Sequence, residues 1–303
     1  MNVVNHLAVV NSAVSPFALS RLVVAMGLCT SLSVAAQSYQ YENSIYYTQI
    51  NRDTAPSQDY DNWGVTLDGV SYFQAVDTSR GPLAEAAFLR RASGVRLTYG
   101  RSETDSSFSS NNYEIQSEYK TDSGLLSIEY YIPNTIFYAG LGVVADKTET
   151  VTKVTSAGIT DSSRDKDGWD YLGTAVLGVT PLDGWLVWTS FIEGQDVSDF
   201  WNIQSKYVWL LPAEQALNFQ VSYAEADDDG FSSSSYALGV DYYINKSVSI
   251  GTAYSATDAD DVDTEDVYEL RVRTFFGDNV SAQASYSEAD DDNYFRIGAS
   301  YRF

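Results

Sequence analysis

Apolar and polar side chains alternate along most of the second half of this 303-residue chain. In LNFQVSY at 217–223, the leucine, phenylalanine, valine and tyrosine share one face of an extended chain, and the polar residues share the other. This period of two predicts β-strands with one apolar face. Five further stretches repeat the pattern, at 236–242, 248–254, 268–273, 280–286 and 295–303.

An internal repeat connects these strands. Tyr223, Tyr254 and Tyr286 each precede an acidic cluster and follow one another at intervals of about two strands and two connections. Short connections, such as those at 181–184 and 244–247, alternate with longer acidic or serine-rich ones. This alternation is typical of transmembrane barrels, which have short turns on one side of the membrane and longer loops on the other.

The whole pattern predicts an all-β fold, a transmembrane antiparallel up-and-down β-barrel of about 14 strands, with 12 or 16 as alternatives. No run after residue 36 is long and apolar enough to span a bilayer as a helix. The earlier strands are less regular than the last six, and we place them at 39–50, 62–76, 93–100, 112–132, 135–146, 168–180, 185–194 and 200–211.

The segment 112–132 is unusually long for a single strand. TDSG at 121–124 resembles a turn, but dividing the segment there gives fifteen strands and places the chain ends on opposite sides. Bacterial barrels of this kind have even strand numbers. We therefore predict one strand with a β-bulge near Gly124, where the apolar positions change from odd to even numbers.

The first 36 residues have the organisation of a secretory signal. Arg21 precedes a short apolar run that ends in small residues before Gln37, and this run is too short for a membrane-spanning helix. We predict a signal peptide at 1–36 and an outer-membrane barrel at 37–303. The segment contains the only cysteine, Cys29, and the only histidine, His6.

The predicted mature chain therefore has no residue for a disulfide, a thiolate nucleophile or an imidazole base. It carries 41 acidic and 17 basic residues, a net charge of −24. We expect no enzymatic activity, no cofactor and no nucleic-acid partner, because nucleic acids bind basic surfaces. The aspartate runs at 227–229 and 290–292 lack the alternate ligand spacing of a calcium loop, so no dedicated metal site is predicted.

The last ten residues, YFRIGASYRF, resemble the closing strand of Gram-negative outer-membrane porins, and GPLAEAAFLRRAS at 81–93 resembles a segment of general porins of gammaproteobacteria. Apart from this likeness, the second segment predicts a short helical turn that Pro82 begins. The resemblance implies a passive channel in the outer membrane, surrounded by lipid and lipopolysaccharide. It also implies that Tyr301 and Phe303 are read by the barrel-assembly machinery and that a homotrimer is one expected assembly.

The polar faces of the strands should line the interior of the barrel, because a charge that faced lipid at the bilayer midplane would cost about 2–4 kcal/mol. These residues either shape solute selectivity or form ion pairs with one another. The candidates are Arg96, Glu129, Lys206, Asp241, Glu269, Arg271, Arg273, Arg296 and Arg302.

The proposed outer connections are strongly acidic and should enrich cations at the mouth of the barrel. Two of them, 146–168 and 101–111, are candidates for a loop that folds inward. The sequence thus favours a porin that passes small hydrophilic solutes and ions with a modest cation preference. The alternatives are a structural or adhesive barrel and a transporter of hydrophobic substrates. The outer connections are 51–61, 101–111, 146–168, 195–199, 227–231, 257–266 and 288–292.

Overall fold

The computed structural model describes residues 38–52, 58–110, 113–193, 199–228, 231–260, 262–289 and 292–303. The predicted signal peptide at 1–36 lies outside these ranges. The strands are β1 (Ser38–Arg52), β2 (Gln58–Asp77), β3 (Gly94–Ser110), β4 (Tyr113–Tyr131), β5 (Phe137–Ser156), β6 (Ile159–Lys166), β7 (Asp170–Val179), β8 (Trp185–Glu193), β9 (Asp199–Leu210), β10 (Ala216–Asp228), β11 (Phe231–Tyr243), β12 (Val248–Ala259), β13 (Val262–Phe276), β14 (Val280–Ala289) and β15 (Asp292–Arg302).

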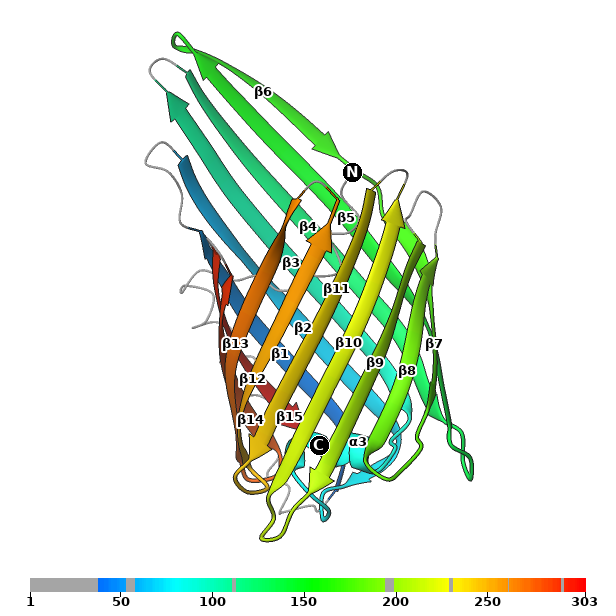
Figure 1. Ribbon diagram of the computed structural model, residues 1–303. Coiled ribbons are helices and arrows are strands. Elements are labelled where there is room, and N and C mark those ends of the chain that lie inside the picture. Colours follow the sequence, from blue (N-terminus) through cyan, green and yellow to red (C-terminus); the bar gives the residue numbers. More distant parts are fainter. Residues whose placement is uncertain are drawn as a thin grey trace.

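Fourteen of these strands form a closed antiparallel barrel (Figure 1). The first and last strands pair with each other, from Glu42 opposite Arg302 to Arg52 opposite Asp292. β4 pairs with β5, and β5 pairs with β7, so the cylinder has no free edge within its membrane-spanning part. The predicted 14-stranded up-and-down barrel is confirmed.

The remaining strand, β6, lies outside the closed cylinder. It pairs with the distal half of β5, from Ser156 opposite Ile159 to Glu149 opposite Lys166. Strands β3 to β6 project beyond the other strands at the upper end of Figure 1. The expected outer connections 101–111 and 146–168 are therefore mostly strand, and neither folds inward in the described part of the chain.

β4 is one continuous strand, as predicted, but the expected bulge near Gly124 is wrong. Gly124 stands opposite Tyr99 on one side and Ala145 on the other, and the register does not shift around it. The apolar pattern changes for another reason. Before Gly124, toward the projecting end of β4, the even-numbered outer positions carry charged residues such as Glu118 and Lys120. This part of the sheet projects past the apolar belt.

An apolar belt surrounds the outside of the barrel. Six outward-facing leucines are between half and two-thirds exposed, far more than a water-soluble protein would leave in one contiguous surface. Such a belt suits contact with lipid hydrocarbon. No helix in the described residues is long and apolar enough to cross a membrane. The belt includes Leu97, Leu126, Leu141, Leu177, Leu238 and Leu270.

The two ends of the barrel differ. The lower end in Figure 1, which we name the turn end, carries the C-terminus and short connections such as the one between β11 and β12. The opposite end, the loop end, carries the long projecting strands. Two clusters of buried apolar side chains lie at the turn end, one around Val76 and Ala86 and the other around Leu89, Val208 and Tyr243.

Candidate functional site

The connection between β2 and β3 folds into the turn end of the barrel (Figure 1). We name residues 78–93 the inner segment. It contains a 3-10 turn, η2 (Leu83–Glu85), followed by the one-turn helix α3 (Ala86–Leu89). Pro82 caps the turn with φ of −64°, which confirms the expected helical turn at this proline. Within the described chain, the inner segment enters the interior of the barrel. The two outer connections that were candidates for an inward fold do not.

A glycine allows the chain to turn inward at this point. Gly81 has φ of +74°, a left-handed conformation that side chains other than glycine adopt at a cost. A Cβ atom at this position would lie 2.6 Å from Leu89 Cδ1 and 2.9 Å from Leu210 Cδ2. The absence of a side chain at Gly81 therefore allows both the turn and the close packing against β9.

Glu85 anchors the inner segment to the barrel wall. Its Oε2 atom lies 2.6 Å from Lys206 Nζ on β9, and its Oε1 atom accepts a hydrogen bond of 2.6 Å from the Tyr243 hydroxyl on β11. Glu85 is only 4% exposed. A buried carboxylate needs both a counter-charge and hydrogen bonds to offset its lost hydration, and Glu85 has them from two strands.

Backbone hydrogen bonds hold the beginning of the inner segment. The Leu83 amide donates to the Lys246 carbonyl at 2.8 Å, and Arg302 Nη1 donates to the Leu83 carbonyl at 2.7 Å. Leu83, Ala86 and Leu89 are buried as well. Polar and apolar contacts together fix the inner segment across the turn end of the barrel.

A cavity of about 400 Å³ lies between the inner segment and the barrel wall. The inner segment contributes Glu85 and Phe88, and the wall contributes Tyr46 and Trp188 among others. Five of the predicted interior residues line this cavity: Arg96, Glu129, Lys206, Arg273 and Arg302. The structure thus gathers side chains from both halves of the chain around one space inside the barrel.

Most interior cations are paired with carboxylates. Lys206 pairs with Glu85, as described above, and Arg96 Nη1 lies 3.2 Å from Asp68 Oδ1. Arg302 Nη2 lies 3.0 Å from Glu42 Oε1. For these three predicted residues the structure shows ion pairs with interior acids.

The predicted residues Asp241 of β11 and Glu269 and Arg271 of β13 form one cluster across β12, where Gly251 lies between Asp241 and Arg271. Arg271 Nε lies 2.6 Å from Asp241 Oδ1, and Arg271 Nη1 lies 2.9 Å from Glu269 Oε1. Asn218 donates a further hydrogen bond of 2.8 Å to Asp241 Oδ2. The cluster carries two carboxylates against one guanidinium.

Two predicted interior arginines differ from the others. Arg273 Nε donates to the side-chain oxygen of Gln283 at 2.8 Å, and the Arg296 guanidinium carbon lies 4.3 Å from the centroid of the Tyr46 ring. Neither arginine forms an ion pair with a carboxylate anywhere in the described ranges of the chain. Their contacts are with polar or aromatic groups, so neither guanidinium has a carboxylate within ion-pair distance.

The strand pattern did not indicate several residues that complete these contacts. Glu85 belongs to no strand, and Asp68, Glu42 and Tyr46 were not among the candidates although they lie on the polar faces of β1 and β2. A signal for the inner segment was present in the sequence. Residues 78–93 are far more numerous than a short turn needs, and they fall on the turn side of the barrel.

The C-terminal aromatic residues lie at the seam between the first and last strands. The ring centroids of Phe303 and Tyr41 are 5.2 Å apart in a stacked arrangement, and those of Phe303 and Tyr301 are 5.7 Å apart. The Phe303 amide donates to the Tyr41 carbonyl at 3.0 Å. The residues predicted as an assembly signal therefore also close the barrel.

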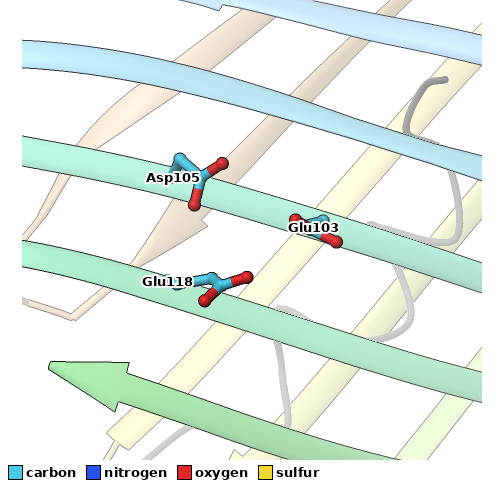
Figure 2. Close-up of side chains that lie close together, drawn as sticks. All are labelled: Glu103, Asp105 and Glu118. Atoms are coloured by element: carbon cyan, nitrogen blue, oxygen red, sulfur yellow. The ribbon is translucent and has the colours of Figure 1, made fainter. Parts of the chain in front are cut away.

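Three carboxylates come together on the projecting strands (Figure 2). Glu103 and Asp105 of β3 and Glu118 of β4 have carboxylate oxygens within 4.8 Å of one another. Burial raises the pKa of the Asp105 carboxyl, and Glu118 raises it further. Of the aspartate runs, Asp229, Asp290 and Asp291 lie outside the described residues, whereas Asp292 Oδ1 accepts a hydrogen bond of 2.7 Å from Arg52 Nε.

Comparisons with known proteins show a matching family model and similar solved structures. A family model described as "Putative general bacterial porin" matches residues 19–303. The outer membrane protein Omp33 of Acinetobacter baumannii has a similar structure, with a TM-score of 0.59 and 19% identity over 88% of this chain and 99% of that chain. OprB of Pseudomonas putida, in a low-pH structure, has a TM-score of 0.47 and 8% identity over 97% of this chain and 100% of that chain. No curated protein matches the chain.

Proposed function

We propose that this chain forms a narrow water-filled channel for passive diffusion of small hydrophilic solutes and ions. The chain belongs to the family described as "Putative general bacterial porin", whose members lie in the outer membrane. The observation that carries the proposal is the closed 14-stranded barrel with an apolar outside and charged side chains inside. Barrels with fewer strands fill their interior with side chains, and those with 16 to 18 strands leave an open channel.

The inner segment forms the narrowest part of the proposed passage. Because the chain belongs to this family, we assign the turn end to the periplasmic side, where barrels of this class have short turns. The cavity of about 400 Å³ lies directly against the inner segment. A solute that passes through the barrel must therefore move past Glu85 and Phe88 or displace the segment that carries them.

A modest cation preference is part of the proposal. The chain has 41 acidic and 18 basic residues, and the predicted outer connections hold a large share of the acids. Such a mouth enriches cations by its summed field, within a Debye length of about 10 Å at 0.1 M salt. Most interior arginines have carboxylate partners, which limits the opposing field of the wall.

The remaining features of the proposal concern biogenesis and surroundings. Residues 1–36 act as a cleaved signal peptide, and Tyr301 and Phe303 engage the barrel-assembly machinery. Lipopolysaccharide surrounds the loop end, and a homotrimer is one form of assembly. The channel itself has no catalytic activity.

Planar-bilayer conductance of the purified protein tests the channel. We expect stepwise openings whose conductance rises in proportion to salt concentration. Preparations that keep heat-modifiable β-structure but show no such openings would contradict the channel and favour a structural or adhesive barrel. Swelling of liposomes that contain the protein in arabinose, a neutral hydrophilic solute, provides a second measurement.

A further inference from the structure

We propose that Arg273 and Arg296 form a binding subsite for the carboxylate group of a small solute inside the barrel. The inference rests on the proposed channel function, because a solute must reach the interior to meet these side chains. It goes beyond that function by naming the chemical group that the wall recognises. It depends on the charge balance of the interior, the register of the strands and the donors that these two residues leave free.

The charge balance separates these two arginines from the other interior cations. Each of the others has a carboxylate oxygen within 3.2 Å, as described above. Arg273 and Arg296 instead contact a neutral amide and an aromatic ring. An amide oxygen and a ring face orient a guanidinium, but they do not neutralise its charge. A carboxylate ligand would supply the direct ion-pair partner that both arginines lack.

The strand register places both guanidinium groups on one part of the wall. Arg273 of β13 stands opposite Gln283 of β14. Gly298 of β15 stands opposite Gln283 on one side and opposite Tyr46 of β1 on the other. Arg296 lies two residues before Gly298, on the same face of β15. Arg273 therefore lies two strands away from Gly298 across the sheet, and Arg296 lies at the neighbouring inward-facing position of β15.

The missing side chain at Gly298 determines how Arg296 is held. A Cβ atom at this position would lie 2.5 Å from Tyr46 Cδ1, so the tyrosine ring lies directly over the glycine. The Arg296 guanidinium then lies above the ring face, 4.3 Å from its centroid. Tyr46 and Arg273 both line the cavity of about 400 Å³ beside the inner segment, and Arg296 adjoins it through its contact with the Tyr46 ring.

Both arginines keep hydrogen-bond donors for a ligand. The Arg296 guanidinium forms no hydrogen bond in the described structure; its Nε atom is buried, so its Nη atoms are the donors that a ligand could meet. Arg273 uses Nε and Nη2 on the same Gln283 oxygen, and no bond of its Nη1 occurs in the described structure. Planar guanidinium groups match the two oxygens of a carboxylate, and the resulting charge-assisted hydrogen bonds are about twice as strong as neutral ones.

Ligand-detected NMR on the detergent-solubilised full-length barrel tests the subsite, with glutamate as the probe and arabinose as the uncharged control. We expect saturation transfer to glutamate and none to arabinose. Arg273→Gln and Arg296→Gln should each weaken glutamate binding roughly tenfold, because each removes a charged donor. The double variant should abolish the signal.

Arg101→Gln is the matched control. Arg101 lies on the projecting part of β3, on the outer face, where its Nη1 atom is 3.4 Å from Asp122 Oδ1. It carries the same substitution without touching the interior, so its glutamate signal should equal that of the unmodified protein. Equal signals from the double variant and the unmodified protein would overturn the subsite. Phosphate binding as tight as glutamate binding would overturn its assignment to carboxylates.

Conductance of the same preparations separates this inference from the proposed function. If the unmodified protein and the double variant both conduct potassium chloride but bind glutamate equally, the channel stands and the subsite fails. If glutamate binds and the double variant loses it, but no preparation conducts, the subsite stands and the channel fails. Circular dichroism and heat-modifiable migration verify that every variant is folded.

Discussion

Glu85 and Lys206, which lie far apart in the sequence, form an ion pair of 2.6 Å inside the barrel. Glu85 belongs to the segment that crosses the turn end, and Lys206 belongs to the wall strand β9. Because the side chain of Glu85 is 5% exposed and that of Lys206 is 22% exposed, solvent screens the pair only weakly. We therefore expect this contact to contribute strongly to holding the inner segment across the turn end.

Glu85→Gln keeps the shape of the side chain but removes its charge. Lys206 then keeps a largely buried charge without a partner, and breaking a buried pair in this way costs about 3–5 kcal/mol. We expect the inner segment to leave its position and single-channel conductance to rise severalfold. Glu214→Gln is the control, since the exposed pair of Glu214 and Lys246 is worth about 0–1 kcal/mol. Equal conductance in the two variants would show that the pair does not hold the segment.

The barrel could be predicted from the sequence because each strand repeats one simple pattern. The alternation at 217–223 and 295–303 reports which side chains face lipid, and it needs no knowledge of the neighbouring strands. The last six strands, whose alternation is strictest, were placed most directly. The predicted bulge at Gly124 was wrong because the pattern does not reveal where a strand leaves the membrane.

The interior contacts could not be predicted in the same way. Which acid meets which arginine depends on the register between strands and on side-chain reach, as in the contact of Arg302 with Glu42 across the barrel seam. The inner segment has no periodic pattern, and its position depends on partners from distant strands such as Tyr243. The charged residues of the wall could be identified from the strand pattern, but which arginines have a carboxylate partner could not.

Gly298→Ala should disturb the contact between Tyr46 and Arg296. The added methyl group would lie 2.5 Å from Tyr46 Cδ1, so the ring must move and the arginine loses the face on which it lies. We expect about 1–3 kcal/mol of destabilisation, as is typical of overpacking, together with weaker glutamate binding. Denaturant unfolding and ligand-detected NMR measure the two effects.

Gly173→Ala is the control for that substitution. A Cβ atom at Gly173 would lie 3.7 Å from the Glu193 carbonyl oxygen, which is an ordinary contact. This variant should unfold and bind glutamate like the unmodified protein. If Gly298→Ala behaves in the same way, the ring does not depend on the missing side chain.

Asp241→Asn tests the electrostatic balance of the interior. Asp241 accepts hydrogen bonds from Arg271 and Asn218 and is 8% exposed, so its charge acts inside the barrel. Its neutralisation adds one net positive charge to the wall. We expect the reversal potential in a potassium chloride gradient to shift toward anion selectivity. Asp183→Asn, at an exposed turn, should shift it less, and equal shifts would contradict an interior origin.

Two carboxylates on the projecting strands should respond to pH with opposite signs. Burial raises the pKa of Asp105, so its ionisation destabilises the fold above that pKa, and the penalty disappears as the pH falls. The Lys166 ammonium lowers the pKa of Glu149, with help from Arg164, so this pair stabilises the fold above the unfolded pKa and is lost in acid.

The two matching variants test these signs. Asp105→Asn should raise the denaturant midpoint near pH 7, and Glu149→Gln should lower it. The Asp105 difference should vanish at about pH 3, where this carboxyl is protonated in the folded and the unfolded chain, and the Glu149 difference should shrink as the pH falls through the lowered folded pKa of Glu149. Denaturant titrations at the two pH values measure the midpoints. A change of the same sign in both variants at neutral pH would contradict the assigned environments.

Phe303→Ala separates the role of the last residue in assembly from its role in stability. Phe303 stacks on Tyr41 and Tyr301, and its backbone pairs with β1, so the substitution removes the aromatic contact but keeps the main-chain hydrogen bonds. If the residue is an assembly signal, the folded fraction in cells should fall severalfold while spontaneous folding into liposomes changes little. Phe276→Ala is the control, because this exposed phenylalanine lies at the same end of the barrel but not at the seam. Equal losses in cells and in liposomes would show that Phe303 acts through stability alone.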